Sequence, residues 1–225
     1  RLEEQFWSNL CSTIIPEDTV QIRRELKQFH LPSTLFDDKF YIGLLEAFIK
    51  PSEDQWEINL FEYAIRNIIA EIFDGLQINI VFTRLKEQHY IICFNKKEVN
   101  NRPQFMKLCN LILSSLIDSL PGIFQIYTGD ETTLLNTGHR FQELINIARS
   151  NLNEDCKIID TTALPLKNYP PKLAAMDEWP DMLVKHKKLE VREQAIKYLN
   201  ELKETRTADR SDLLRFYHVL QLFAL

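Results

Sequence analysis

The chain has 225 residues, enough for one large domain or two small ones with a buried core. Hydrophobic residues make up 45% of it and charged residues 26%, a composition that is typical of a folded protein and excludes intrinsic disorder. The formal net charge is -5, and a domain that grips nucleic acid usually carries a large basic patch, so we do not expect this chain by itself to bind DNA or RNA. Its short basic clusters are interpreted as solvated faces: Arg23-Arg24, Lys96-Lys97 and Lys185-His186-Lys187-Lys188.

Cysteine usage favours a reducing cytoplasm. The four cysteines, Cys11, Cys93, Cys109 and Cys156, are far apart, and none has the CxxC spacing of a zinc or redox site. Cys93 and Cys109 lie in apolar runs, which predicts buried thiols. No apolar run approaches the roughly 18 residues of a membrane span, and no signal peptide is visible, so we expect no membrane contact.

In chain order, the spacing of apolar residues first predicts two short helices, at residues 1–13 and 17–29. Tyr41 to Ile49 is a continuous apolar run rich in β-branched and aromatic side chains, which predicts a buried strand. A long helix over residues 54–74 follows, with Ser52 or Asp54 as its N-cap and Gly75 after its C-terminus. The next predicted elements are a strand at 78–83, a turn at 85–88, a strand at 89–94, a helix at 103–120, a strand at 123–128, a helix at 134–151 and a strand at 157–161.

This order is β-α-β-β-α-β followed by α-β, which predicts an α+β sandwich whose antiparallel or mixed sheet carries helices on one face. We expect N-terminal linker helices at 1–35, the α+β domain at 36–163 and a further segment at 164–225. That last segment contains a proline-rich connector and then two helices, 189–205 and 211–225, which form an α-helical hairpin. Because the chain begins without Met and both ends fall within amphipathic segments, we interpret it as a piece of a larger protein.

The motif search predicts no catalytic, cofactor-binding or metal-binding residues. There is no glycine-rich phosphate loop, no GxSxG and no histidine pair with HxH or HExxH spacing. Cys93 is interpreted as a core residue and His218 as a packing residue. Gly129-Asp130-Glu131 follows a predicted strand, where two acids could bind a cation or form a capped turn, and we favour the turn.

Several stretches resemble the region between the receiver and the DNA-binding domain of AraC-type (YesN-like) two-component response regulators, with a degenerate GGDEF, or nucleotide-cyclase-like, domain in the middle. They are RLEEQFW at 1–7, LFEYAIRNII at 60–69, Tyr127-Thr128-Gly129 before a helix, Trp179, Tyr198-Leu199 and LLRFYHVLQ at 213–221. The resemblance implies a ferredoxin-like βαββαβ sandwich with flanking helices and a C-terminal α-hairpin.

The chain departs from the pattern of an active diguanylate cyclase. The resemblance places the Gly-Gly-Asp/Glu-Glu-Phe motif in the turn at 85–88, which here reads Leu-Lys-Glu-Gln, with no glycine pair and one acid. It also requires an acid near the end of the first strand, where Glu46 is the only candidate. Metal-assisted phosphoryl transfer needs several converging carboxylates, so we expect no catalysis.

The expected function is therefore a non-catalytic signal relay that links a receiver to an AraC-type DNA-binding domain, both outside this sequence, so that DNA is bound only through the missing part. We expect a homodimer, and Leu2, Phe6 and Leu10 are the candidate dimer contact; the alternative is that this stripe packs on its own domain. A second hypothesis is a sensor of a small-molecule effector, and a third is an enzyme of unrecognised type.

Overall fold

A computed structural model describes residues 2–50, 56–86, 88–151, 155–163, 179, 182, 185 and 187–205. The chain divides into two compact units, Arg1–Ala148 with Glu154–Leu164, and Arg149–Asn153 with Pro165–Leu225.

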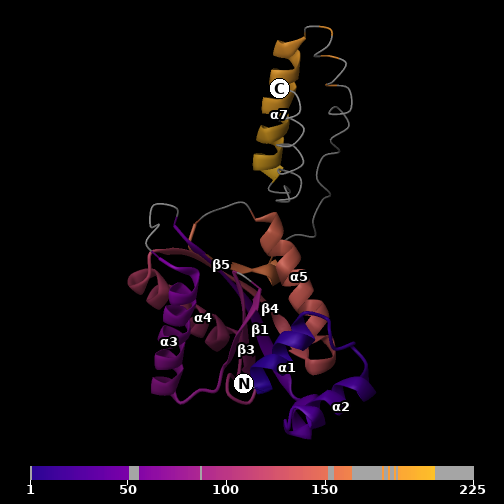
Figure 1. The fold of residues 1–225 in the computed structure, drawn as a ribbon, viewed down its shortest axis with the longest axis vertical. Helices are drawn as coiled ribbons and strands as arrows, with labels where there is room; N and C mark the ends of the chain where they lie inside the picture. The colour runs from indigo at the N-terminus through magenta and orange to yellow at the C-terminus, as the bar shows by residue number, and fades with distance from the viewer. Residues whose placement is uncertain are drawn as a thin grey trace. The chain divides into compact units, whose positions relative to one another are not determined.

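The described residues of the first unit form an α+β structure around one mixed sheet (Figure 1). Its five strands lie in the order β2-β3-β1-β4-β5. Neighbouring strands are antiparallel except for β4 and β5, which are parallel. The strands are β1 (Lys39–Ile49), β2 (Val81–Lys86), β3 (His89–Asn95), β4 (Gly122–Thr133) and β5 (Lys157–Asp160).

The predicted helices of the first unit are confirmed, with small shifts at their ends. They are α1 (Leu2–Cys11), α2 (Thr19–Gln28), α3 (Ile58–Leu76), α4 (Arg102–Ser119) and α5 (Thr137–Ser150), with short 3-10 turns at Ser33–Asp37, Leu134–Asn136 and Thr161–Ala163. Two of them start at side-chain caps. Asp18 accepts from the backbone N–H groups of Val20 and Gln21 in α2, and Asn101 accepts from Gln104 in α4.

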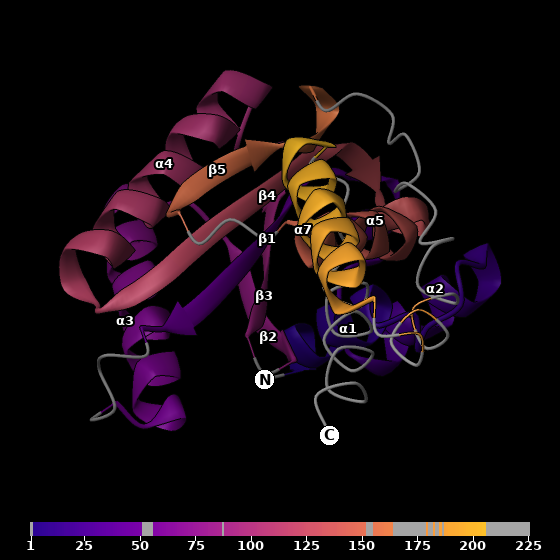
Figure 2. The same ribbon diagram turned by 90° about the horizontal axis from the view of Figure 1, so that it is seen from above.

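Helices cover both faces of the sheet, so the prediction of helices on one face is wrong. α3 and α4 lie on one side, and α1, α2 and α5 lie on the other (Figure 2). Alternate residues of β1 supply the two cores: Tyr41, Leu45 and Ala47 pack with the α3–α4 layer, and Phe40, Ile42 and Leu44 with the other layer. The continuous apolar run in β1 is the pattern of a strand buried on both faces.

The N-terminal helices, predicted as a linker over residues 1–35, belong to the first unit and to its core. α1 contributes Phe6, Trp7 and Leu10 to the core beneath α5, and α2 contributes Ile22 and Leu26. All five side chains are at most 1% exposed. This packing makes the segment part of the domain rather than a spacer before it.

Two predicted boundaries are corrected. β2 begins at Val81 rather than at residue 78. α3 continues through Gly75 and ends where Gln77 adopts a left-handed conformation, with φ 55°. The Ile78 N–H then bonds to the carbonyl of Phe73. The helix therefore ends at Gln77, two residues after Gly75, where the sequence predicted its end. The predicted N-caps Ser52 and Asp54 lie outside the described residues.

The second unit contains α7 (Lys188–Thr205), which confirms the helix predicted at 189–205. Trp179 is 1% exposed, and its indole Nε1 donates to Oε1 of Gln194 in α7 at 2.8 Å. The proline-rich connector, apart from Trp179, and the partner helix at 211–225, with His218, lie outside the described residues. Among the helices described, none has both the length and the apolarity that a membrane crossing requires.

Candidate functional site

The acid that the cyclase resemblance singled out, Glu46, lies in a buried polar cluster on the central strands. The cluster contains Glu46 of β1, His89 of β3, and Gln125 and Tyr127 of β4. Glu46 is directly opposite His89 on one side and Gln125 on the other. All four residues lie on the sheet face that also carries Ile42 and Leu44, because side chains alternate along each strand.

Hydrogen bonds connect the members of this Glu46 cluster. His89 Nε2 lies 3.2 Å from Glu46 Oε1, and the Tyr127 hydroxyl is 3.4 Å from Glu46 Oε2. The same hydroxyl donates to Oε1 of Gln125 at 2.5 Å, and Nε2 of Gln125 donates to the carbonyl of Asp155 at 3.1 Å. Both carboxylate oxygens of Glu46 therefore face partners supplied by the neighbouring strands.

Burial leaves little of this cluster open to solvent. The side chain of Glu46 is 8% exposed and that of His89 is 19% exposed, while Tyr127 is 0% exposed. A carboxylate, an imidazole and a phenol are groups used in acid–base chemistry, but here they bond to one another inside the fold. Among the residues that the structure describes, no three His, Cys, Asp or Glu side chains come together as a metal site.

The β2–β3 turn lies beside Glu46, so the two positions that the resemblance compares are neighbours in space. β2 ends at Lys86 and β3 begins at His89, which confirms the predicted hairpin. The Ala47 N–H donates to the carbonyl of Gln88 at 3.0 Å, which fastens the turn to β1 directly after Glu46. Glu87, the acid of the turn, lies outside the described residues.

Sequence reasoning missed His89, Gln125 and Tyr127. A signal was available in the sequence. Each of these polar side chains lies in an otherwise apolar strand, two residues from a side chain that faces the core. Their meeting with Glu46 depends on the register between three strands, and no local pattern supplies that register.

Gly129-Asp130-Glu131 lies within β4, so the predicted turn is wrong. β4 accommodates the Gly-Asp pair as a bulge opposite Ile42, because Tyr41 pairs with Glu131 while Gly43 pairs with Thr128. The strand then continues through Thr133.

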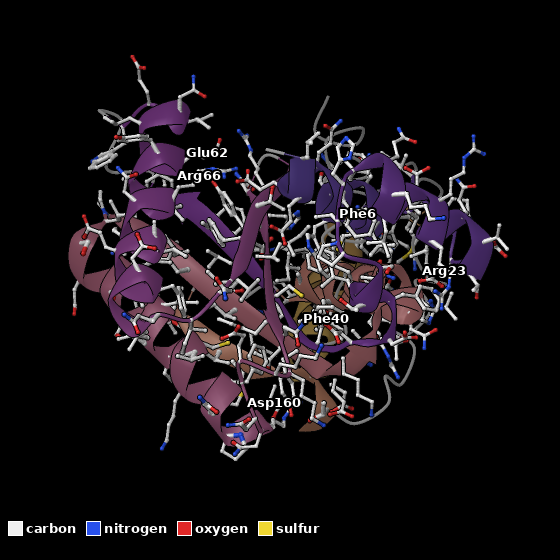
Figure 3. All side chains as sticks on the ribbon, turned by 90° about the horizontal axis from the view of Figure 1, so that it is seen from below. Phe6, Arg23, Phe40, Glu62, Arg66 and Asp160 are labelled. Carbon is white, nitrogen blue, oxygen red and sulfur yellow. The ribbon has the colours of Figure 1, made fainter. Side chains whose placement is uncertain are left out.

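Arg102 of α4 forms ion pairs with Asp130 of this bulge and with Asp160 at the end of β5. Asp130 bonds to the Arg102 guanidinium at 3.2 Å, and that guanidinium also binds Asp160, labelled in Figure 3, at 2.5 Å. Burial tends to raise the pKa of Asp160, but hydrogen bonds from Thr162 and the charge of Arg102 hold it below its usual value. These acids therefore stabilise the ends of β4 and β5.

Glu131 bridges Lys39 and Lys96, and this arrangement predicts a loss of stability in acid. Hydrogen bonds from Lys39, at 2.7 Å, and from Lys96 lower the pKa of Glu131 to about 2 from a usual 4.5. A carboxyl with a lowered folded-state pKa stabilises the fold above its unfolded pKa and loses this contribution as pH falls toward the folded one. Urea unfolding should therefore show wild type more stable than Glu131→Gln at pH 7, with the difference shrinking from about pH 4.5 to pH 2. A difference independent of pH over that range would contradict the ion-pair assignment.

The predicted dimer stripe is divided by the structure. Leu2 is 53% exposed, whereas Phe6 and Leu10 are 0% exposed. The Phe6 ring lies edge-on to Trp7 and Phe29 with centroid distances of 5.8 and 5.9 Å, inside the core seen in Figure 3. Phe6 and Leu10 thus pack on their own domain, and Leu2 remains the member of the stripe that a partner can reach.

The remaining predictions for individual side chains concern burial. Cys93 and Cys109 are buried, as predicted, and burial raises the pKa of both thiols well above the usual value.

Glu62 and Arg66 of α3, labelled in Figure 3, pair with each other at 3.2 Å. Glu62 also binds Arg84 of β2, and Arg66 lies 3.4 Å from Glu4 of α1, so this charged network joins both helical layers at β2.

Compared with models of known protein families, with curated proteins and with solved structures, the chain matches none. The class of the protein is thus given by its fold. Over the described residues it is an α+β protein with a mixed central sheet that helices cover on both faces.

Proposed function

We propose that this chain is a non-catalytic regulatory domain of a bacterial two-component transcription regulator, where it connects a receiver to an AraC-type DNA-binding domain. In this proposal the first unit is a degenerate GGDEF-like domain, and DNA is bound by the domain that follows it. The proposed protein acts in the cytoplasm as a homodimer.

The strand order supports the GGDEF-like part of the proposal. β2-β3-β1-β4 is the order produced when α3 connects β1 to β2 and α4 connects β3 to β4, each crossing one antiparallel strand. Both crossover helices pack on the same face. This order supports the proposed βαββαβ arrangement of ferredoxin-like sandwiches, with α5 and β5 as an extension.

The observation that carries the non-catalytic part is the state of Glu46. Its carboxylate lies beside the β2–β3 turn, where the resemblance requires metal-binding acids, and it instead bonds to His89 and faces the Tyr127 hydroxyl at 3.4 Å. A carboxylate that is 8% exposed and already hydrogen-bonded must lose those partners before it can bind Mg²⁺. This supports a sheet that kept its framework while its former catalytic edge became part of the core.

Reading the gene on both sides of this sequence tests the relay. We expect a receiver domain upstream and a pair of helix-turn-helix motifs downstream. The absence of both would contradict the proposal and would favour the effector-sensor hypothesis, which a thermal-shift screen of nucleotides, sugars and metabolites would then examine.

The non-catalytic part has its own assay. The purified full-length protein is incubated with GTP and Mg²⁺, and product formation is compared between wild type and Glu46→Ala. We expect no turnover in either protein. Turnover by wild type that Glu46→Ala abolishes would overturn the non-catalytic assignment.

A further inference from the structure

The end of α1 and the loop that follows it are held on the N-terminal half of α5. The Cys11 carbonyl, at the end of α1, accepts a hydrogen bond from Nε2 of Gln142 in α5 at 2.8 Å. The Glu17 carboxylate, from the same loop, accepts from the backbone N–H of His139. Two side chains on different segments thus tie the N-terminal helices to α5.

Glu17 provides a charge that α5 itself does not have. The first N–H groups of a helix lack intrahelical partners, and the helix dipole favours a negative charge beside them. The first turn of α5, which begins Thr137-Gly138-His139-Arg140, contains no acidic residue. Glu17, which lies more than a hundred residues earlier in the chain, fills this role.

Gly138 permits this close approach. A Cβ at this position would lie 2.8 Å from the backbone carbonyl oxygen of Leu10 and 3.2 Å from Oε1 of Glu17. The first distance is shorter than real Cβ contacts allow, and the obstructing atom is backbone of α1, so the C-terminal turn of α1 would have to move. A glycine is therefore required here by packing and not by an unusual φ angle, since no glycine of the described residues has a positive one.

The helix that receives these contacts also carries the chain out of the first unit. α5 runs from Thr137 to Ser150, and its last residues, from Arg149 on, belong to the second unit. Its apolar face, with Phe141, Leu144 and Ile145, shares a core with Phe6 and Leu10 of α1. A displacement of the N-terminal helices therefore acts on α5 through a common core and through the Glu17 contact.

We propose that the docking of the Cys11–Asp18 loop on the first turn of α5, through Glu17 and Gly138, is the regulatory contact by which a change in the N-terminal helices reaches the second unit. This inference rests on the proposed relay function and names the residues that perform it. In the docked state Glu17 and Gln142 hold α5 in place. When the loop leaves, the first turn of α5 loses its anion, and Gln142 loses its contact with the Cys11 carbonyl.

Hydrogen exchange of the full chain tests the contact, with Glu17→Ala as the main variant and Glu25→Ala as the matched control. Glu25 is a carboxylate on neighbouring α2 that bonds to Gln21 within its own helix. In Glu17→Ala, the amides of Gly138 and His139 should lose protection by about five- to tenfold, as expected for a lost helix cap. The proposal further requires a loss of about threefold or more at Arg149, Ser150 and along α7. Glu25→Ala should change none of these.

The amides of Leu44 and Ile92, in the central strands, separate coupling from general destabilisation. They should be unchanged in Glu17→Ala. A loss confined to the first turn of α5, a uniform loss that includes Leu44 and Ile92, or no loss anywhere would each overturn the coupling.

Gly138→Ala provides a second route, because its methyl group should push away the end of α1 and the Glu17 carboxylate and reproduce the same exchange pattern while Glu17 is present. A Gly138→Ala protein whose α5 and α7 amides exchange as in wild type would also overturn the proposal. The flanking-gene test is independent of these outcomes, so a receiver and a helix-turn-helix pair found beside an uncoupled α5 would leave the relay function standing without this contact.

Discussion

Replacing Phe6 with alanine is expected to lower the free energy of unfolding of the first unit by about 3–5 kcal/mol, the range for a fully buried phenylalanine whose removal leaves a cavity. Phe6 is 0% exposed, and its ring contacts Trp7 and Phe29 edge-on. The core around it combines α1, α2, α5 and the sheet, so little can collapse into the space without moving a helix. Urea unfolding followed by circular dichroism measures the change.

Leu2→Ala is the matched control from the same helical stripe. Leu2 is 53% exposed, and its truncation should change the free energy of unfolding by less than about 0.5 kcal/mol. The pair also separates folding from association. If Leu2 contributes to a dimer, Leu2→Glu should shift the mass in solution toward the monomer without unfolding the chain. A Phe6→Ala protein as stable as wild type would contradict the placement of α1 in the core.

The helices and most strands could be predicted because local periodicity determines them. The apolar positions of α4, spaced three or four residues apart, and the apolar run of β1 each identify one element without reference to the rest of the chain. The sequence of β1 also indicates the layer arrangement. A strand whose side chains are apolar on both faces must be covered on both faces. Expecting helices on one face overlooked that signal, and the same oversight placed α1 and α2 in a linker although Phe6 and Leu10 needed a core.

β4 shows where local chemistry misleads. Gly129-Asp130 has the composition of a turn, yet the strand continues because pairing with β1 through a bulge keeps its backbone hydrogen-bonded. Arg102 forms an ion pair with Asp130, and Lys39 and Lys96 form ion pairs with Glu131. These three cations come from β1, α4 and the segment after β3, so the compensation that makes an acidic pair acceptable in a strand is distant in sequence.

In the Glu46 cluster, too, one residue could be predicted from the sequence and its partners could not. Glu46 could be singled out because the resemblance requires an acid near the end of the first strand, but its partners could not, since His89 is 43 residues away and Tyr127 is 81 residues away. A shift of one residue in the β1–β3 register would turn one of the two side chains to the opposite face. Identifying the cluster therefore requires the strand pairing, and the pairing requires the whole sheet.

Replacing Glu46 with alanine is expected to destabilise the first unit by about 3 kcal/mol, because removing one member of a buried charged or hydrogen-bonded pair leaves the other without its partner. His89→Ala should cost about 1–2 kcal/mol, since the imidazole is partly exposed and can be solvated in part. The double variant should be more stable than the sum of the two losses predicts, by about 1 kcal/mol or more, as residues in direct contact show in double-mutant cycles. Glu71→Ala, at an exposed position of α3, provides the control and should stay within about 0.5 kcal/mol of wild type.

The sign of the Glu46→Ala effect bears on function. A carboxylate kept in place for a ligand or metal commonly costs the folded protein stability, so its removal is neutral or stabilising. A carboxylate whose partners are His89 and Tyr127 contributes to the fold, and its removal is destabilising. Destabilisation with a coupling to His89 would therefore support the proposed non-catalytic domain, because the acid beside the β2–β3 turn is then committed to the core. A more stable Glu46→Ala protein would mean that the carboxylate is held for a partner that the fold itself does not supply.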